Sequence, residues 1–223
     1  TTTAVKALTT AQIAAMEIVD VAVLNDTNIA ALSSVQVRAL TTRQIIGLTT
    51  AQISELNTTT LQALTSKQIA ALETEDVSLL GSSNVTSLSS TQLRALNTLQ
   101  VAQLTSAQLI GLGSTLLSQL QASQLTGLST SNLNGLVSAS LGALTSAQIA
   151  GLTTDQVANL TTTALSYLST RGVSGFSTSQ IAALSTTQVS NLSSTSVKIL
   201  SAVQLGAMET ADLAALSFKN QLS

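Results

Sequence analysis

The sequence contains no cysteine, histidine, proline or tryptophan, and these absences remove most catalytic and metal chemistry. Without Cys or His there is no thiol nucleophile, no disulfide, no zinc or haem ligand of the usual types, and no side chain that titrates near neutral pH. No serine has a His, or a matched Lys and Asp, with which to form a nucleophile. We therefore predict that the chain is not an enzyme and has no catalytic, cofactor-binding or metal-binding residues.

Charged and aromatic side chains are scarce as well. Only 8% of the 223 residues are charged, and 8 basic residues against 10 acidic ones give a net charge of -2. This balance argues against nucleic acid or an anionic membrane surface as a partner. The sequence has no run of about 18 apolar residues, which is the length needed to span a bilayer. The aromatic residues Tyr167, Phe176 and Phe218 are too few for an ordinary globular core at this length.

A period of eight residues runs through the chain. Every residue number divisible by eight, from Leu8 to Leu216, is large and apolar, and 24 of these 27 positions hold Leu. A second column, from Val5 to Leu213, lies three residues earlier and holds only Val, Ile or Leu. We call each unit an octad and number its positions one to eight, with the consensus Thr-Thr-x-Gln-Ile-x-x-Leu. The repeat predicts one continuous solenoid over residues 1–217, with 27 octads, and a degenerate C-terminal end at 218–223.

The spacing of the two apolar columns favours short helices. Residues three apart share a face of a helix but lie on opposite faces of a strand. One long helix is excluded, because at about 100° per residue eight residues overshoot two turns by roughly 80°, and the apolar stripe would wind round the helix. We therefore predict an all-α repeat fold, a narrow solenoid of very short capped helices with one helix per octad.

Polar residues at the start of each octad explain how the helix is interrupted. Ser, Thr or Asn at position one and Gln or Asp at position four have the spacing of a capping box, as in Thr9 with Gln12. Nine of the ten acidic residues lie at positions one to four, where a helix N-terminus favours negative charge. Gly and Asn at position seven, for example Gly151 and Asn159, are predicted to adopt the left-handed conformation that ends many helices.

A β-solenoid is the alternative fold. Thr-rich columns and low charge suit short stacked strands, with Ser/Thr and Gln ladders along the coil. Against it stand the odd spacing of the apolar columns, the Ala and Gln content, and the presence of only 11 Gly for the many corners of such a coil.

Two groups of polar residues are candidates for binding. Wherever Glu takes position one, Asp takes position four: Glu17 with Asp20, Glu73 with Asp76, and Glu209 with Asp212. Paired carboxylates suggest Ca²⁺, but each pair supplies too few of the roughly six to eight oxygens that this ion requires. We expect these acids to stabilise helix N-termini instead. The regular Ser/Thr columns could contact ice or polysaccharide, although capping and solubility explain them more simply.

The run Leu-Thr-Thr-Ala-Gln-Ile-Ala-Ala at 8–15, with variants that begin at Leu144 and Leu184, resembles the octapeptide repeat tracts of very large bacterial secreted or surface proteins. Those proteins are adhesin-like or filament-like, and the resemblance covers essentially the whole chain. It implies a structural role and an extracellular or bacterial cell-surface location, and it transfers no catalytic or binding residue. The start in register at Thr1, without an initiator Met or an apolar leader, is expected of a portion of a longer polypeptide.

These features together predict an extracellular structural repeat protein, a rod or self-assembling filament subunit of a bacterial surface appendage, adhesin stalk or biofilm matrix. The expected partner is a second copy of the chain, end to end or side by side, with surface polysaccharide as a further candidate. Nucleic acid and membrane insertion are not expected. The alternative function is a binding module whose Ser/Thr ladder contacts ice or polysaccharide.

Overall fold

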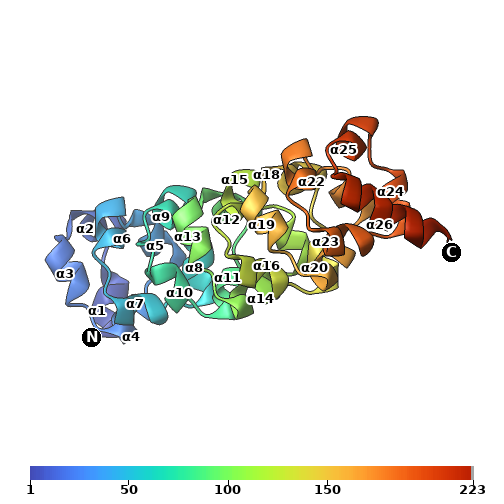
Figure 1. Cartoon of the computed structure of the whole chain (residues 1–223). Coiled ribbons are helices and arrows are strands. Elements are labelled where there is room, and N and C mark those ends of the chain that lie inside the picture. The colour runs from blue at the N-terminus through green and yellow to red at the C-terminus, as the bar shows by residue number, and fades with distance from the viewer. Residues whose placement is uncertain (222–223) are drawn as a thin grey trace. The chain divides into compact units, whose positions relative to one another are not determined.

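The computed structural model describes residues 1–221, apart from the side chains of Asp26 and of residues 217–221. In this part of the chain there are 26 α-helices and no strand (Figure 1). The predicted all-α repeat solenoid is therefore confirmed, and the β-solenoid alternative is wrong. The odd spacing of the apolar columns is the physical reason, because it places positions five and eight on the same side of a helix.

Each helix lies within one octad, except α14, which spans two, and α26, which continues beyond position eight of its octad. The chain divides into two compact units, Thr1–Gly111 and Leu112–Ser223. The helices of the first unit are α1 (Thr2–Ala7), α2 (Thr10–Ala15), α3 (Ile18–Ala22), α4 (Asp26–Ala30), α5 (Ser34–Ala39), α6 (Thr42–Ile46), α7 (Thr50–Ser54), α8 (Thr58–Ala63), α9 (Ser66–Ala70), α10 (Asp76–Leu79), α11 (Ser82–Thr86), α12 (Ser90–Ala95) and α13 (Thr98–Ala102). The division falls within α14 (Ser106–Leu117), whose helical geometry is interrupted at Gly113.

The second unit continues with one helix per octad. Its helices are α15 (Ala122–Leu125), α16 (Thr130–Asn134), α17 (Ser138–Gly142), α18 (Ser146–Gly151), α19 (Thr154–Ala158), α20 (Thr162–Ser166), α21 (Thr170–Val173), α22 (Thr178–Ala182), α23 (Thr186–Ser190), α24 (Ser194–Lys198), α25 (Ala202–Gly206) and α26 (Thr210–Gln221). The predicted degenerate end at 218–223 lies outside the residues whose side chains are described.

The capping residues predicted at position one begin most of the helices. Thr9 is the N-cap of α2, where its hydroxyl accepts from Gln12 N–H and Gln12 Oε1 accepts from Thr9 N–H. The same reciprocal pair begins α6 at Thr41 and α22 at Ser177. An octad with this pair therefore satisfies backbone groups that a helix of only five or six residues would otherwise leave unpaired.

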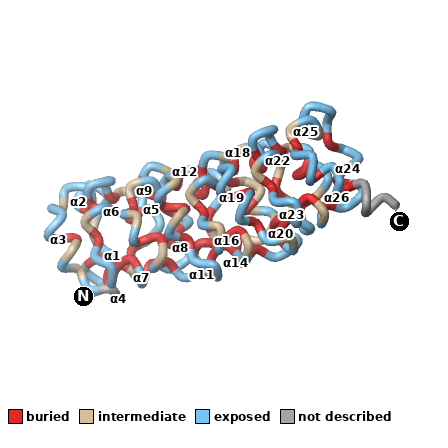
Figure 2. Tube along the Cα trace, in the orientation of Figure 1, coloured by how far each residue is buried: buried red, intermediate tan, exposed pale blue. Residues whose placement is uncertain are grey.

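The core of each unit consists of the two apolar columns. Position five is almost completely buried in most octads, as at Ile45 and Val157, both 0% exposed, although Leu213 is 44% exposed; position eight is nearly as buried. Figure 2 shows buried stretches recurring from helix to helix along the chain. The burial of two aliphatic side chains is too small by itself to offset the conformational entropy lost when eight backbone residues are ordered. Contacts between octads must therefore stabilise every helix.

Helices three octads apart pack against each other within each unit. Examples are α2 with α5, α9 with α12, α15 with α18 and α23 with α26. Hydrogen bonds that join octads reach from 25 to 31 residues along the chain, as from Arg38 to Ala63 and from Gln44 to Ile13. One turn of each solenoid thus takes between three and four octads.

The prediction of left-handed residues at position seven is wrong. Gly151 and Asn159, at position seven of their octads, have negative φ, and Gly113 has the only positive φ among the described residues. At Gly151 and Gly175, glycine is instead required by a close approach to position two, three octads earlier. A Cβ added to Gly151 would lie 2.6 Å from Ala122 Cβ, and one added to Gly175 would overlap the backbone of Ser146.

Candidate functional site: the glutamine column

Glutamine at position four connects two helices that lie far apart in the sequence. Gln44 is 2% exposed. Its Oε1 accepts from Thr41 N–H at 2.7 Å, which closes the start of α6. Its Nε2 donates to the carbonyl oxygens of Ile13 and Met16, both at 2.8 Å, at the end of the octad four units earlier. An amide can do both because it carries an acceptor and two donor hydrogens.

The donor half of this arrangement recurs along both units. Among the described residues, at least twelve glutamines donate to the position-eight carbonyl 28 residues earlier, with N···O distances of 2.6–2.9 Å. They are Gln36, Gln44, Gln52, Gln68, Gln92, Gln100, Gln108, Gln148, Gln156, Gln180, Gln188 and Gln204. Each such bond satisfies a carbonyl at a helix C-terminus, where no partner exists within the helix. We call this contact the glutamine clasp.

The clasp was not predicted from the sequence, where the same glutamines indicated only a capping box. At a net contribution of about 0.5–1.5 kcal/mol per hydrogen bond, the clasp adds to the adhesion between turns that the buried apolar columns provide. Gln12 shows the difference, because it forms the capping box although its side chain is exposed. Capping a helix therefore does not require the burial that accompanies the clasp.

Shorter residues at position four fill this role incompletely. Asn84 still reaches the position-eight carbonyl, donating from Nδ2 to Leu56 O. Ser140 is completely buried, and its hydroxyl has no hydrogen-bond partner among the described residues. At position four, asparagine is thus long enough to donate to the earlier carbonyl, whereas serine is not.

Polar residues at position six form a second, sparser set of links. Arg38 Nε donates to Ala63 O at 3.1 Å, and Gln62 Nε2 donates to Ser87 O at 3.2 Å, in each case 25 residues ahead. Asn134 Nδ2 donates to Asn159 O at 2.9 Å in the same way. These position-six links lie at the surface of each unit, whereas the glutamines of the clasp are buried.

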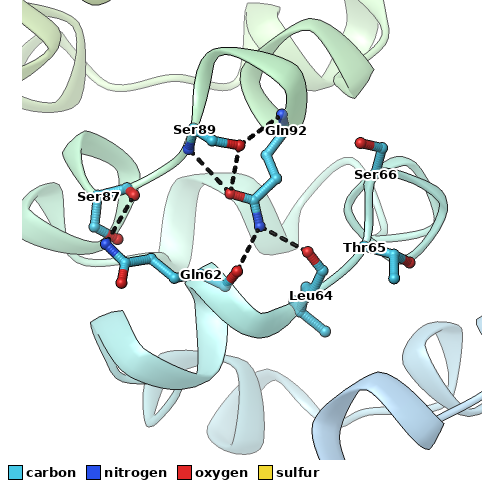
Figure 3. Close-up of a pocket in the computed structure, with 7 residues that line it drawn as sticks. All are labelled: Gln62, Leu64, Thr65, Ser66, Ser87, Ser89 and Gln92. Atoms are coloured by element: carbon cyan, nitrogen blue, oxygen red, sulfur yellow. Dashed lines mark hydrogen bonds between the residues drawn. The ribbon is translucent and has the colours of Figure 1, made fainter. Parts of the chain in front are cut away.

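A shallow surface hollow of about 390 Å³ lies where the two sets of links meet in the first unit (Figure 3). Its lining residues are Gln62, Leu64, Thr65, Ser66, Ser87, Ser89 and Gln92. Gln92 Nε2 donates to Leu61 O at 2.9 Å and to Leu64 O at 2.7 Å, and its Oε1 accepts from Ser89 N–H and Oγ–H. The polar groups around the hollow are therefore mostly engaged with the chain itself, and no charged side chain lines it.

The three Glu–Asp pairs lie at helix starts. Asp20, Asp76 and Asp212 each accept, through Oδ2, from the N–H of the Glu three residues earlier at 3.1–3.3 Å. Within the described residues there is no group of three or more acidic, His or Cys side chains suited to a metal ion. These contacts favour the capping interpretation of the pairs over the Ca²⁺ interpretation.

The exposed hydroxyl residues at position two do not take part in the glutamine clasp. Thr50, Thr154 and Thr178 at position two are exposed, and in each case the neighbouring residue at position one is the N-cap. Across residues 1–221, no helix combines the length and apolar character that crossing a bilayer would require.

The fold and the clasp define an all-α repeat protein in which each octad is one structural step. Four blocks of the sequence, residues 13–50, 69–106, 130–162 and 164–194, match the ALTTAQ repeat model and cover more than half of the chain. The chain therefore belongs to the ALTTAQ repeat family. The first two blocks begin at Ile13 and Ile69, which accept from Gln44 and Gln100 inside the same blocks. A search of curated proteins found no match.

Proposed function

We propose that the chain is a non-enzymatic structural spacer, an extracellular rod or filament subunit of a bacterial surface appendage, adhesin stalk or biofilm matrix. The glutamine clasp is the observation that carries this proposal. Every clasp joins an octad to the one four units earlier with the same bonds, so further octads can be added without a new kind of interface. Length would then scale with copy number, as a spacer requires.

The repeated octads also support self-association. Octads at the end of a repeat array present the same donors and carbonyls that pair inside it, and solenoid ends normally need a polar cap to prevent stacking. We therefore propose end-to-end or lateral association between copies. Sedimentation velocity and negative-stain microscopy of the purified chain would test it. Concentration-dependent elongated particles are expected, whereas compact monomers at every concentration would contradict self-assembly.

The spacer role has its own test. Insertion of a second copy of residues 145–176, which comprise four octads, should increase the maximum dimension measured by small-angle X-ray scattering by a constant step for each copy inserted. A particle that becomes wider rather than longer would contradict the spacer role, whether or not copies associate. Labelling of intact cells of the source organism with an antibody against the chain would test the extracellular location.

A second candidate function is recognition of ice or polysaccharide by the hydroxyl columns. The exposure of Thr50, Thr154 and Thr178, which leaves their hydroxyls accessible, favours it. Substitution of all three by Lys should then abolish thermal hysteresis or glycan retention while the circular dichroism spectrum is unchanged. Absence of both activities in the unmodified chain would remove this candidate.

A further inference from the structure

Asp76 occupies position four, where most octads carry a glutamine, and it is 3% exposed. Its Oδ2 accepts from Glu73 N–H at 3.1 Å, so it supplies the acceptor half of the glutamine arrangement. An ionised carboxylate has no hydrogen to donate and cannot form the other half. The octad of Asp76 therefore has a cap but no clasp when the carboxyl is ionised.

Asn84 shows how far a side chain as long as that of aspartate extends from position four. Asn84 lies at position four of the next octad, and its Nδ2 donates to the carbonyl of Leu56, 28 residues earlier. The corresponding carbonyl for Asp76 is that of Leu48. Aspartate and asparagine have the same length and shape, so the second carboxyl oxygen of Asp76 has the reach to approach Leu48 O, where only a donor is favourable.

We propose that Asp76 is an acid-strengthened clasp. With its carboxyl protonated, Asp76 donates Oδ1–H to Leu48 O while Oδ2 continues to accept from Glu73 N–H, which reproduces both functions of a glutamine. The proton comes from solvent. With its carboxyl ionised, this joint between residues 41–48 and residues 73–80 is open and a buried charge faces a carbonyl dipole. Mild acidity would thus tighten one joint of the first unit, whatever role the repeat serves.

The charged groups around Asp76 favour the protonated form. Burial raises the pKa of Asp76 from its ordinary value of 3.8, the Glu73 N–H bond partly offsets this rise, and the carboxylates of Glu73 and Glu75 add to it. Helix α10 packs against α7, whose C-cap is the exposed Glu55. The octad of Leu48 carries Arg43, whose side chain is exposed.

The sign of the pH effect follows from the raised pKa. Because the folded state holds this proton more tightly than the unfolded state, the stabilisation by Asp76 is fully present below pH 3.8, the unfolded value. It is lost as the pH rises through the pKa of the folded state. Other carboxylates titrate in the same region, so the effect must be measured as a difference between variants.

Asp76→Asn is the direct test, because asparagine donates at every pH. In the full chain, its melting temperature should exceed that of the unmodified protein by about 3 °C near pH 7.5, and this difference should shrink towards zero near pH 4. The matched control is Asp155→Asn, which removes an exposed acid at position three and should give no such convergence. A difference that is independent of pH, or a lower melting temperature for Asp76→Asn near pH 7.5, would overturn the proposal.

Asn84→Asp places an aspartate at position four of the next octad. It provides a second test if Asp76→Asn folds poorly. It should lower the melting temperature near pH 7.5 and recover most of the loss near pH 4. A carboxyl ¹³C titration of Asp76 by NMR gives a local readout, and it should report a pKa above the ordinary value of 3.8. A pKa at or below that value, or a loss for Asn84→Asp that persists in acid, would contradict the clasp.

Discussion

Two adjacent stretches of the second unit differ in how they are tied to earlier octads. In residues 177–192, Gln180 donates to Ile149 O at 2.9 Å and Leu152 O at 2.6 Å, and Gln188 donates to Leu160 O at 2.7 Å. In residues 161–176, position four holds Ala164 and Gly172, which have no side-chain donor. Both stretches nevertheless keep one helix per octad and the same buried apolar columns. The apolar columns therefore specify the fold, and the clasp adds adhesion between turns.

The stretch without clasps is partly compensated by another residue. A glutamine at position 164 would accept a hydrogen bond from Thr161 N–H. In its absence, Thr161 N–H donates to Asn134 Oδ1 at 2.8 Å. Asn134 also donates to Asn159 O at 2.9 Å. A position-six side chain thus replaces the capping half of the missing glutamine but not the bonds to the earlier carbonyls.

The largest effect is expected when a clasped octad is made like an unclasped one. Gln180→Ala removes two strong donor bonds and the acceptor for Ser177 N–H, and leaves a cavity at a residue that is 2% exposed. We expect a loss of about 3 kcal/mol in the free energy of unfolding, measured by urea denaturation. Gln12→Ala is the matched control, since it loses only a cap, worth about 1 kcal/mol. Equal losses for the two variants would mean that the clasp contributes little.

The reverse substitution, Gly172→Gln, should stabilise the unclasped stretch. A Cβ on Gly172 meets its nearest atoms at 3.6–3.7 Å, ordinary contact distances, and one of these atoms is Leu144 O, the predicted acceptor. Removal of a helical glycine and addition of the clasp should together give about 2 kcal/mol. Gly206→Ala, at a glycine with open surroundings, reports the backbone contribution alone. A gain no larger than that of Gly206→Ala would argue against clasp formation.

The smallest effect concerns the compensation by Asn134. Asn134→Ala should cost about 1 kcal/mol, because its bonds to Asn159 and Thr161 lie at the surface. Ala164→Gln should rescue part of this loss, since the new amide can accept from Thr161 N–H. A double-mutant cycle measures the coupling between the two sites. Strict additivity of the two substitutions would show that Asn134 does not substitute for the missing glutamine.

Local spacing was enough to predict the helices and their caps. The three-residue separation of positions five and eight, and pairs such as Thr9 with Gln12, act within one octad and are visible in the sequence. The clasp and the number of octads per turn depend on contacts 25–31 residues away, which an eight-residue pattern does not fix. For the same reason, glycine at position seven was assigned to backbone conformation, whereas Gly151 and Gly175 are small because other octads approach them.

One sequence signal could have revealed the clasp. Glutamate forms a capping box as well as glutamine does, and negative charge is favoured at a helix N-terminus. Yet position four holds 14 Gln and no Glu in the chain. Capping alone does not explain that bias, whereas a requirement for a donor amide facing carbonyl oxygens does.

Gln180→Glu separates the two roles of glutamine most directly, with Gln12→Glu as its control. Glutamate keeps the acceptor that caps the helix, but at position 180 it directs a buried carboxylate at the carbonyls of Ile149 and Leu152. Urea unfolding near pH 7.5 should show a loss of about 3 kcal/mol or more for Gln180→Glu and a change within about 0.5 kcal/mol for Gln12→Glu. Two equally small changes would contradict the clasp and leave the glutamine column with capping as its sole role.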